Sequence, residues 1–74
     1  MIVYNQLWET MKAKNISQYR LIHKYGISPS QITRLKRNES VSTNTIDVLC
    51  NILQCDIHDI MSFTIDKTPE EMEV

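Results

Sequence analysis

The chain has 74 residues, of which 42% are hydrophobic, and its single glycine and two prolines exclude both a largely disordered chain and a turn-rich β-sandwich. A chain this short forms one modest domain, and because it lacks an apolar run of roughly 18 residues and a signal peptide, we expect it to be cytoplasmic. The net charge of -1 conceals a division: residues 12–37 carry seven basic and no acidic residues, whereas residues 38–74 carry eight acidic residues and one basic residue. The basic half fits either a nucleic-acid partner or a solvated helical face, and the charge alone favours neither.

The first predicted helix runs from about Val3 to Lys14. Four side chains at helical spacing form its inner face: Tyr4, Leu7, Trp8 and Met11. Asn15 follows, and asparagine readily takes the left-handed conformation that ends a helix.

A second helix is predicted from about Gln18 to Tyr25, with Ser17 as its cap. Its expected buried side chains are Leu21, Ile22 and Tyr25. Gly26, the only glycine in the chain, then takes the positive φ that ends this helix. Because Ser28 can cap the next helix, only three residues join the two helices, which is the spacing of a helix-turn-helix.

The third helix is predicted from Pro29 to Arg37, and its start signal is unusually complete. Ser28 is the cap, Pro29 stands at the first helical position, and Gln31 completes a capping box. Ile27 and Ile32 are expected to form a hydrophobic staple across this start. With Ile32 and Leu35 facing inward, the helical period places four side chains on the outward face: Ser30, Thr33, Arg34 and Arg37.

A fourth helix is predicted from its cap Ser42 to about Gln54, after a left-handed stop at Asn38. Its expected buried stripe is Ile46, Leu49, Cys50 and Leu53. Asp56 is expected to cap a short fifth helix with apolar contacts from Ile57, Ile60 and Met61. We expect a domain over residues 1–65 and a loose acidic tail over residues 66–74.

Two cysteines and a histidine within nine residues, Cys50, Cys55 and His58, are ligand types for zinc, but their spacing does not fit a closed site. Both cysteines lie in an apolar helical pattern, so we interpret them as packed thiols of a reduced compartment. His23 has no acidic neighbour in the sequence, and no nucleophile-base pair is evident. We therefore expect a protein that is not an enzyme, with no cofactor, no metal and no small-molecule ligand.

The predicted elements resemble the Cro/CI-type (XRE-like) helix-turn-helix family of phage and bacterial repressors over roughly residues 3–62. Three stretches carry most of the likeness: Ser17 and Gln18 for the family's Thr/Ser-Gln pair, Gly26, Ile27 and Ser28 for its Gly-Val-Ser turn, and Ile32, Thr33, Arg34 and Leu35 for its Ile-Ser-Arg-Ile stretch. Lys36 and Asn38 depart from the family's Glu and Gly, and Pro29 stands where some members read a base with a polar side chain. The resemblance implies a compact, all-α, five-helix lambda-repressor-like domain that regulates transcription by binding DNA.

The resemblance and the helix phase together imply a set of DNA contacts. Base contacts are expected from Ser30, Thr33 and Arg34, and an arginine can bond both O6 and N7 of guanine. Backbone contacts are expected from Gln18, Gln31, Lys36, Arg37, Ser42 and Asn44. Gln31 has an alternative role, because the capping box would use its side chain locally.

The leading hypothesis is a sequence-specific repressor that places the helix of residues 29–37 in the major groove of double-stranded DNA. Specific affinity then requires a homodimer on a pseudo-palindrome, formed through the C-terminal region. The fifth helix and Phe63 could make that contact or could simply close the core. An antitoxin or adaptor on the same scaffold is the alternative function, and an enzyme is the weakest one.

Overall fold

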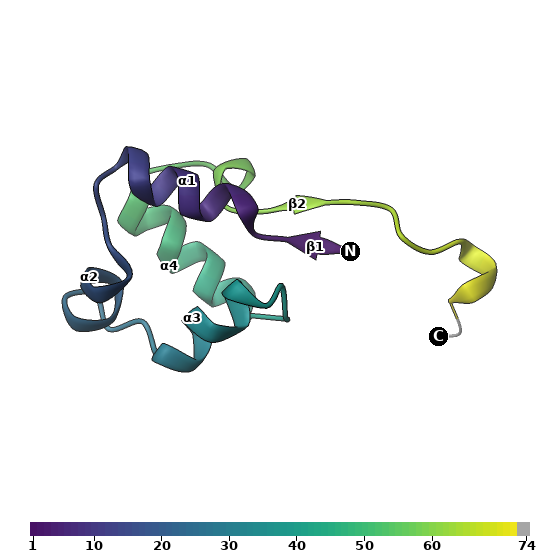
Figure 1. The fold of residues 1–74 in the computed structure, drawn as a ribbon, viewed down its shortest axis with the longest axis horizontal. Coiled ribbons are helices and arrows are strands. Elements are labelled where there is room, and N and C mark those ends of the chain that lie inside the picture. The colour runs from purple at the N-terminus through teal and green to yellow at the C-terminus, as the bar shows by residue number, and fades with distance from the viewer. Residues whose placement is uncertain (73–74) are drawn as a thin grey trace.

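The structure is a computed structural model that describes residues 1–72, and four α-helices pack together in its main body (Figure 1). In chain order the elements are β1 (Ile2–Val3), α1 (Asn5–Ala13), α2 (Gln18–His23), α3 (Pro29–Lys36), α4 (Thr43–Leu53), the 3-10 turn η1 (Ile57–Asp59), β2 (Ser62–Phe63) and the 3-10 turn η2 (Pro69–Glu71). From β2 onward the chain leaves the body as an extended arm (Figure 1). The molecule is therefore elongated, with extents of 44 × 22 × 17 Å.

One apolar core joins the four helices to the chain just after η1. Its buried members are Tyr4, Leu7, Met11, Leu21, Ile27, Ile32, Leu35, Ile46, Leu49, Leu53 and Ile60. Each fully buried leucine or isoleucine contributes on the order of 1.5–3 kcal/mol relative to an exposed one. The helical phases predicted for α1, α3 and α4 are confirmed by this set, since the inward residues recur at the expected spacing.

Six residues expected in the core are less buried than the sequence pattern predicts: Trp8, Ile22, Tyr25, Cys50, Ile57 and Met61. Tyr25 is 37% exposed, because α2 ends at His23 and the helical phase does not extend to this residue. Ile57 is 46% exposed and Cys50 is half-buried. The segment after α4 forms a single 3-10 turn, η1, so the five-helix count is not confirmed.

The predicted all-α class needs one correction, a small antiparallel sheet at the two ends of the domain. Ile2 pairs with Phe63 and Val3 pairs with Ser62, so Val3 belongs to a strand and the first helix begins at Asn5. Two-residue strands show no alternating pattern, and the partner lies about 60 positions away in the sequence. Local sequence signals therefore could not reveal this pairing.

Side-chain caps and left-handed residues fix the ends of the helices. The hydroxyl oxygens of Ser17, Ser28 and Ser42 accept hydrogen bonds from the third backbone N–H of α2, α3 and α4, at 3.1, 3.4 and 3.2 Å. Asn15 and Asn38 take positive φ values of 57° and 55°, as predicted. Gln54 also takes a positive φ, 50°, and ends α4 without a sequence signal that we recognised.

The predicted acidic tail is described as far as Met72, and all of its residues from Asp66 to Met72 are exposed. The carboxylate of Asp66 forms an ion pair with the amino group of Met1 at 2.8 Å, which holds the start of the arm against β1. Glu73 and Val74, which complete the predicted tail, lie outside the described residues. The domain boundary at residue 65 and the looseness of the tail stay predictions.

Candidate nucleic-acid interface

The corner between α2 and α3 has the geometry of a helix-turn-helix. Gly26 takes a φ of +76°, and its N–H donates to the carbonyl oxygen of Ile22 at 3.2 Å. The N–H of Ile27 donates to the carbonyl oxygen of Leu21 at 2.9 Å, and the buried Ile27 side chain anchors the turn. A Cβ placed on Gly26 would meet no heavy atom within 4 Å, so the backbone conformation, and not lack of space, favours glycine here.

Helix α3 exposes the face that the sequence predicted. Ile32 and Leu35 are 4% and 0% exposed, which fixes the rotation of the helix about its axis. Five polar side chains face outward as a result: Ser30, Thr33, Arg34, Lys36 and Arg37. The predicted base-contact residues therefore share one exposed face with two of the predicted backbone contacts.

The three predicted base-contact residues differ in how their side chains are engaged. The hydroxyl of Ser30 lies 2.7 Å from that of Ser28, and the hydroxyl of Thr33 donates to the carbonyl oxygen of Pro29 at 3.2 Å. Within residues 1–72, the guanidinium of Arg34 has neither a hydrogen-bond nor an ion-pair partner. Its five N–H donors are thus available to an external acceptor.

Gln31 is used by tertiary structure instead of by a capping box. Its backbone N–H donates to Ser28, as a cap requires, but its side-chain oxygen accepts from the hydroxyl of Thr45 in α4 at 3.2 Å. The capping-box role predicted for this side chain is therefore wrong. Gln31 and Asn44 instead border a shared hollow of about 230 Å³ between the helix-turn-helix corner and the start of α4.

The remaining predicted backbone contacts lie at two helix starts. Gln18 is the first residue of α2 and is half-buried. Ser42 caps α4 and Asn44 lies in its first turn, and both are exposed. The hydroxyl of Ser42 is already engaged, since it accepts from the N–H of Thr45, which leaves Asn44 as the more available of the two side chains.

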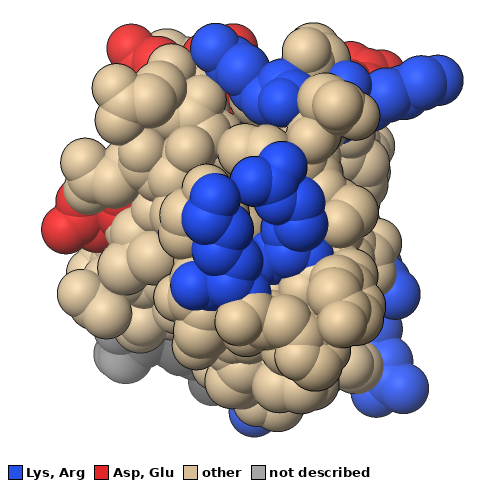
Figure 2. All heavy atoms as spheres, turned by 90° about the vertical axis from the view of Figure 1, so that its left-hand side faces the viewer, with Lys and Arg blue, Asp and Glu red and all other residues tan. Residues whose placement is uncertain are grey.

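Basic side chains gather on one side of the molecule. Figure 2 shows them running across the face on the α2 side, with acidic side chains only toward its edges. All seven basic residues of the segment 12–37 are exposed: Lys12, Lys14, Arg20, Lys24, Arg34, Lys36 and Arg37. The ion pair of Asp66 with Met1 is the one salt bridge among the described residues, so none of these cations is neutralised there. Such a face attracts polyanions through the summed field of its charges.

A sequence-family model described as the Cro/C1-type HTH DNA-binding domain matches residues 6–66. The chain belongs to this family. The crystal structure of the transcriptional regulator VanUg, Form II, is similar, with 31% sequence identity and a TM-score of 0.75. The similarity covers 82% of this chain and 81% of that chain. No curated protein matches the chain significantly.

Lys12, Lys14 and Arg20, which belong to the basic segment 12–37 noted in the sequence, extend the basic face of this Cro/C1-type domain beyond α3. One contact was not predicted from the sequence. On α2, the rings of Tyr19 and His23 stack with centroids 4.2 Å apart and an interplanar angle of 34°. Their spacing of four residues places both on one side of a helix, and could have predicted that contact.

The two cysteines of this Cro/C1-type domain are free and half-buried. Burial raises the pKa of both thiols above the ordinary value near 9, so Cys50 and Cys55 are thiols, not thiolates, at neutral pH. No group of three His, Cys, Asp or Glu side chains within residues 1–72 could hold a metal ion. Over the same residues, no helix is long and apolar enough to cross a membrane.

Proposed function

We propose that this protein is a sequence-specific transcriptional repressor that places α3 in the major groove of double-stranded DNA. The observation that carries the proposal is the guanidinium of Arg34, which has no partner within residues 1–72 and lies on the exposed face of α3, held there by the burial of Ile32 and Leu35. An arginine in the groove bonds O6 and N7 of guanine, and a good bidentate contact is worth about 1–3 kcal/mol of discrimination. Ser30 and Thr33 are proposed to add contacts to base edges, Thr33 as an acceptor or through its methyl group because its hydroxyl already donates to Pro29.

Backbone contacts are proposed for the residues that flank this face. Lys36 and Arg37 lie at the end of α3, where the helix leaves the groove and approaches phosphates. Gln18 and Asn44 lie at the starts of α2 and α4, where amide groups and helix dipoles favour an anion. The side-chain oxygens of Ser42 and Gln31 are engaged within the protein. These two residues are therefore proposed to support DNA binding through their backbone groups and through the packing of α3 on α4.

One recognition helix covers only a few base pairs, so we propose that the protein acts as a homodimer on a pseudo-palindromic operator. The two half-sites would lie about 34 Å apart, which is one turn of B-DNA. Repression follows if the operator overlaps a sequence that the transcription machinery needs. We propose that the protein binds its operator in the cytoplasm.

The experiment that tests the proposal is a titration of random-sequence duplex at two salt concentrations. If several phosphates are neutralised, the slope of log affinity against log salt is about -0.9 for each of them. A steep loss of affinity supports DNA binding. A flat response, or no binding at low salt, contradicts it and favours the alternative function of a protein-interaction module on this scaffold.

A further inference from the structure

Large apolar side chains are exposed mainly at one end of the molecule. Among the described residues, eight such side chains are exposed, and two of them, Tyr19 and Tyr25, belong to the helix-turn-helix region. The other six lie around the sheet and the arm: Met1, Ile2, Ile57, Phe63, Ile65 and Met72. Phe63 and Ile65 are 64% and 80% exposed. Leaving this much apolar surface in water is unfavourable in free energy unless another surface covers it.

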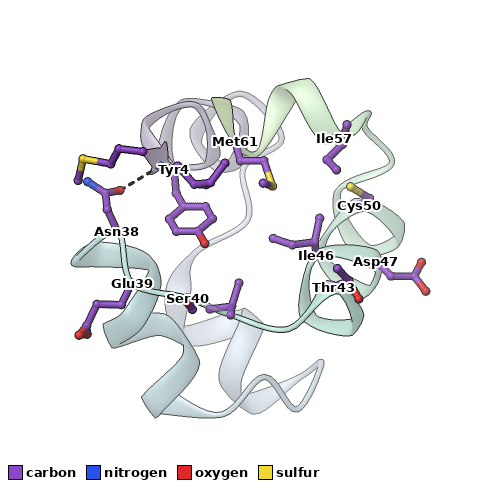
Figure 3. Close-up of a pocket in the computed structure, with 13 residues that line it drawn as sticks. Tyr4, Asn38, Glu39, Ser40, Thr43, Ile46, Asp47, Cys50, Ile57 and Met61 are labelled. Carbon is purple, nitrogen blue, oxygen red and sulfur yellow. Dashed lines mark hydrogen bonds between the residues drawn. The ribbon is translucent and has the colours of Figure 1, made fainter. Parts of the chain in front are cut away.

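These six side chains line two adjoining hollows. The first, of about 600 Å³, lies between β1, the loop before α4, α4 itself and η1, and we call it the groove. In Figure 3 Tyr4 and Ile46 face each other across it, with Met61 and Ile57 toward the top of the view. We call residues 63–72 the arm. The second hollow, of about 700 Å³, is bounded by Met1 and by residues of the arm. Met1 lines both hollows, so the apolar surface is continuous from the groove to the arm.

The pairing of β1 with β2 directs the arm away from the groove. Phe63 lies beside Ile2, and the N–H of Thr64 donates to the carbonyl oxygen of Met1 at 2.9 Å. The chain therefore passes Met1 and continues outward from the helical body (Figure 1). The groove is lined by Met1, Ile57 and Cys50 among others, and by no residue of the arm. A single copy thus presents an apolar arm and an unfilled apolar groove that its own arm does not enter.

We propose that a second copy of this chain covers this surface by a reciprocal exchange, in which Phe63 and Ile65 of each arm pack into the groove of the other copy beside Ile57. A two-fold axis near Met1 makes such an exchange self-complementary, because each copy supplies one arm and one groove. Together the two hollows are lined by 20 residues, and a stable interface takes roughly 20–30 residues from each partner. The proposal rests on the proposed function, whose operator requires a dimer, and it names the surfaces that form it.

The charges around this surface determine how much of the arm enters the groove of the other copy. Glu39 and Asp47 border the groove, and the arm carries Asp66, Glu70 and Glu71 against a single Lys67. Like charges exclude the acidic part of the arm from the groove, so the apolar contact is made by the segment that starts at Phe63. Salt screens this repulsion, and association of the two copies should therefore strengthen as salt rises. DNA binding has the opposite salt dependence.

The first test is the mass of the protein in solution without DNA, measured by sedimentation equilibrium over a wide range of concentration. The wild-type chain should approach twice its 8.7 kDa, and more readily at higher salt. Ile65→Asp should weaken association about tenfold or more, as loss of a central apolar contact does. Because Ile65 is 80% exposed, this change should leave the helical circular dichroism intact. Tyr19→Asp, at a 70% exposed residue outside the surface, is the matched control and should still dimerise.

The second test asks whether the arm meets the groove. At a concentration just sufficient to make the wild type dimeric, Ile65→Asp and Ile57→Lys should each be mainly monomeric alone, but their mixture should form a one-to-one heterodimer. In that heterodimer one arm-groove contact is native and the other pairs aspartate with lysine. A mixture that stays monomeric while the wild type dimerises would overturn the exchange, as would a wild type that is monomeric throughout or an Ile65→Asp variant that associates as tightly as the wild type. None of these outcomes involves DNA, so a chain that dimerises in this way and binds no duplex would refute the proposed function alone.

Discussion

The side-chain oxygen of Gln31 in α3 accepts a hydrogen bond from the hydroxyl of Thr45 in α4, over 3.2 Å. The same threonine donates its backbone N–H to Ser42, the cap of α4. Helix α3 is thereby joined to the start of α4, and both of these segments are proposed to contact DNA. This hydrogen bond therefore fixes the position of α3 relative to the start of α4.

Replacing Thr45 with valine keeps the side-chain volume and removes the hydroxyl. The Thr45 hydroxyl is hydrogen-bonded to both the Gln31 side-chain oxygen and the Ser42 hydroxyl, each at 3.2 Å. We expect a loss of about 0.5–1.5 kcal/mol in the free energy of unfolding for each of these hydrogen bonds. Urea denaturation measures it directly. Thr43→Val is the control, because Thr43 is exposed and lies two residues earlier on the same helix. Equal losses in the two variants would show that the Gln31 contact contributes nothing of its own.

Replacing Gly26 with alanine forces a Cβ into a backbone with a φ of +76°. Because the added atom would have no neighbour within 4 Å, the cost is conformational, about 1–2 kcal/mol, and Gly26→Val should cost more. A loss of 1 kcal/mol lowers the melting temperature of a domain this size by about 4–8 °C. Asn15→Gly, at another left-handed position, should change stability by less than about 0.5 kcal/mol. An unchanged melting temperature for Gly26→Ala would refute the strain argument.

Arg37 lies one residue beyond α3 and is proposed to bind a phosphate. Arg37→Ala should weaken binding to all duplexes by a similar factor and reduce the salt slope by about 1. Lys67→Ala, on the arm, is the control and should leave the slope unchanged. Fluorescence anisotropy with duplexes of different sequence gives both quantities. A loss confined to one sequence would reassign Arg37 to base recognition.

The half-buried cysteines give the domain a stability that depends on pH in the alkaline range. Because the folded pKa values of Cys50 and Cys55 lie above the unfolded value near 9, their contribution to stability is complete below that pH. This contribution is lost as the pH rises through the pKa values of the folded chain. In that range the cysteines of the unfolded chain deprotonate more readily than those of the folded chain. Chemical denaturation of the wild type and of Cys50→Ala between pH 8 and pH 10 checks this. The wild type should lose more stability than the variant over that interval, and parallel curves would contradict the assignment.

Signals that act within a few residues predicted most of the helical body. The three serine caps, the left-handed residues Asn15 and Asn38, and the spacing of Ile32 and Leu35 all operate locally, and each appears where expected. The predictions that were wrong concern residues that make tertiary contacts. Val3 pairs with Ser62, and Gln31 bonds Thr45 instead of its own helix start, because contacts distant in sequence outweighed local preferences. The outward face of α3 was predictable because a buried pair only three residues apart fixes it.

The central claim is that Arg34 reads a base from the exposed face of α3. In vitro selection of bound duplexes from a random pool, with the wild type and with Arg34→Ala, tests it most directly. We expect the wild type to select a symmetric consensus and the variant to lose preference at one guanine in each half-site, with about 1–3 kcal/mol less discrimination there. A variant that keeps both the wild-type affinity and the wild-type consensus would contradict the account.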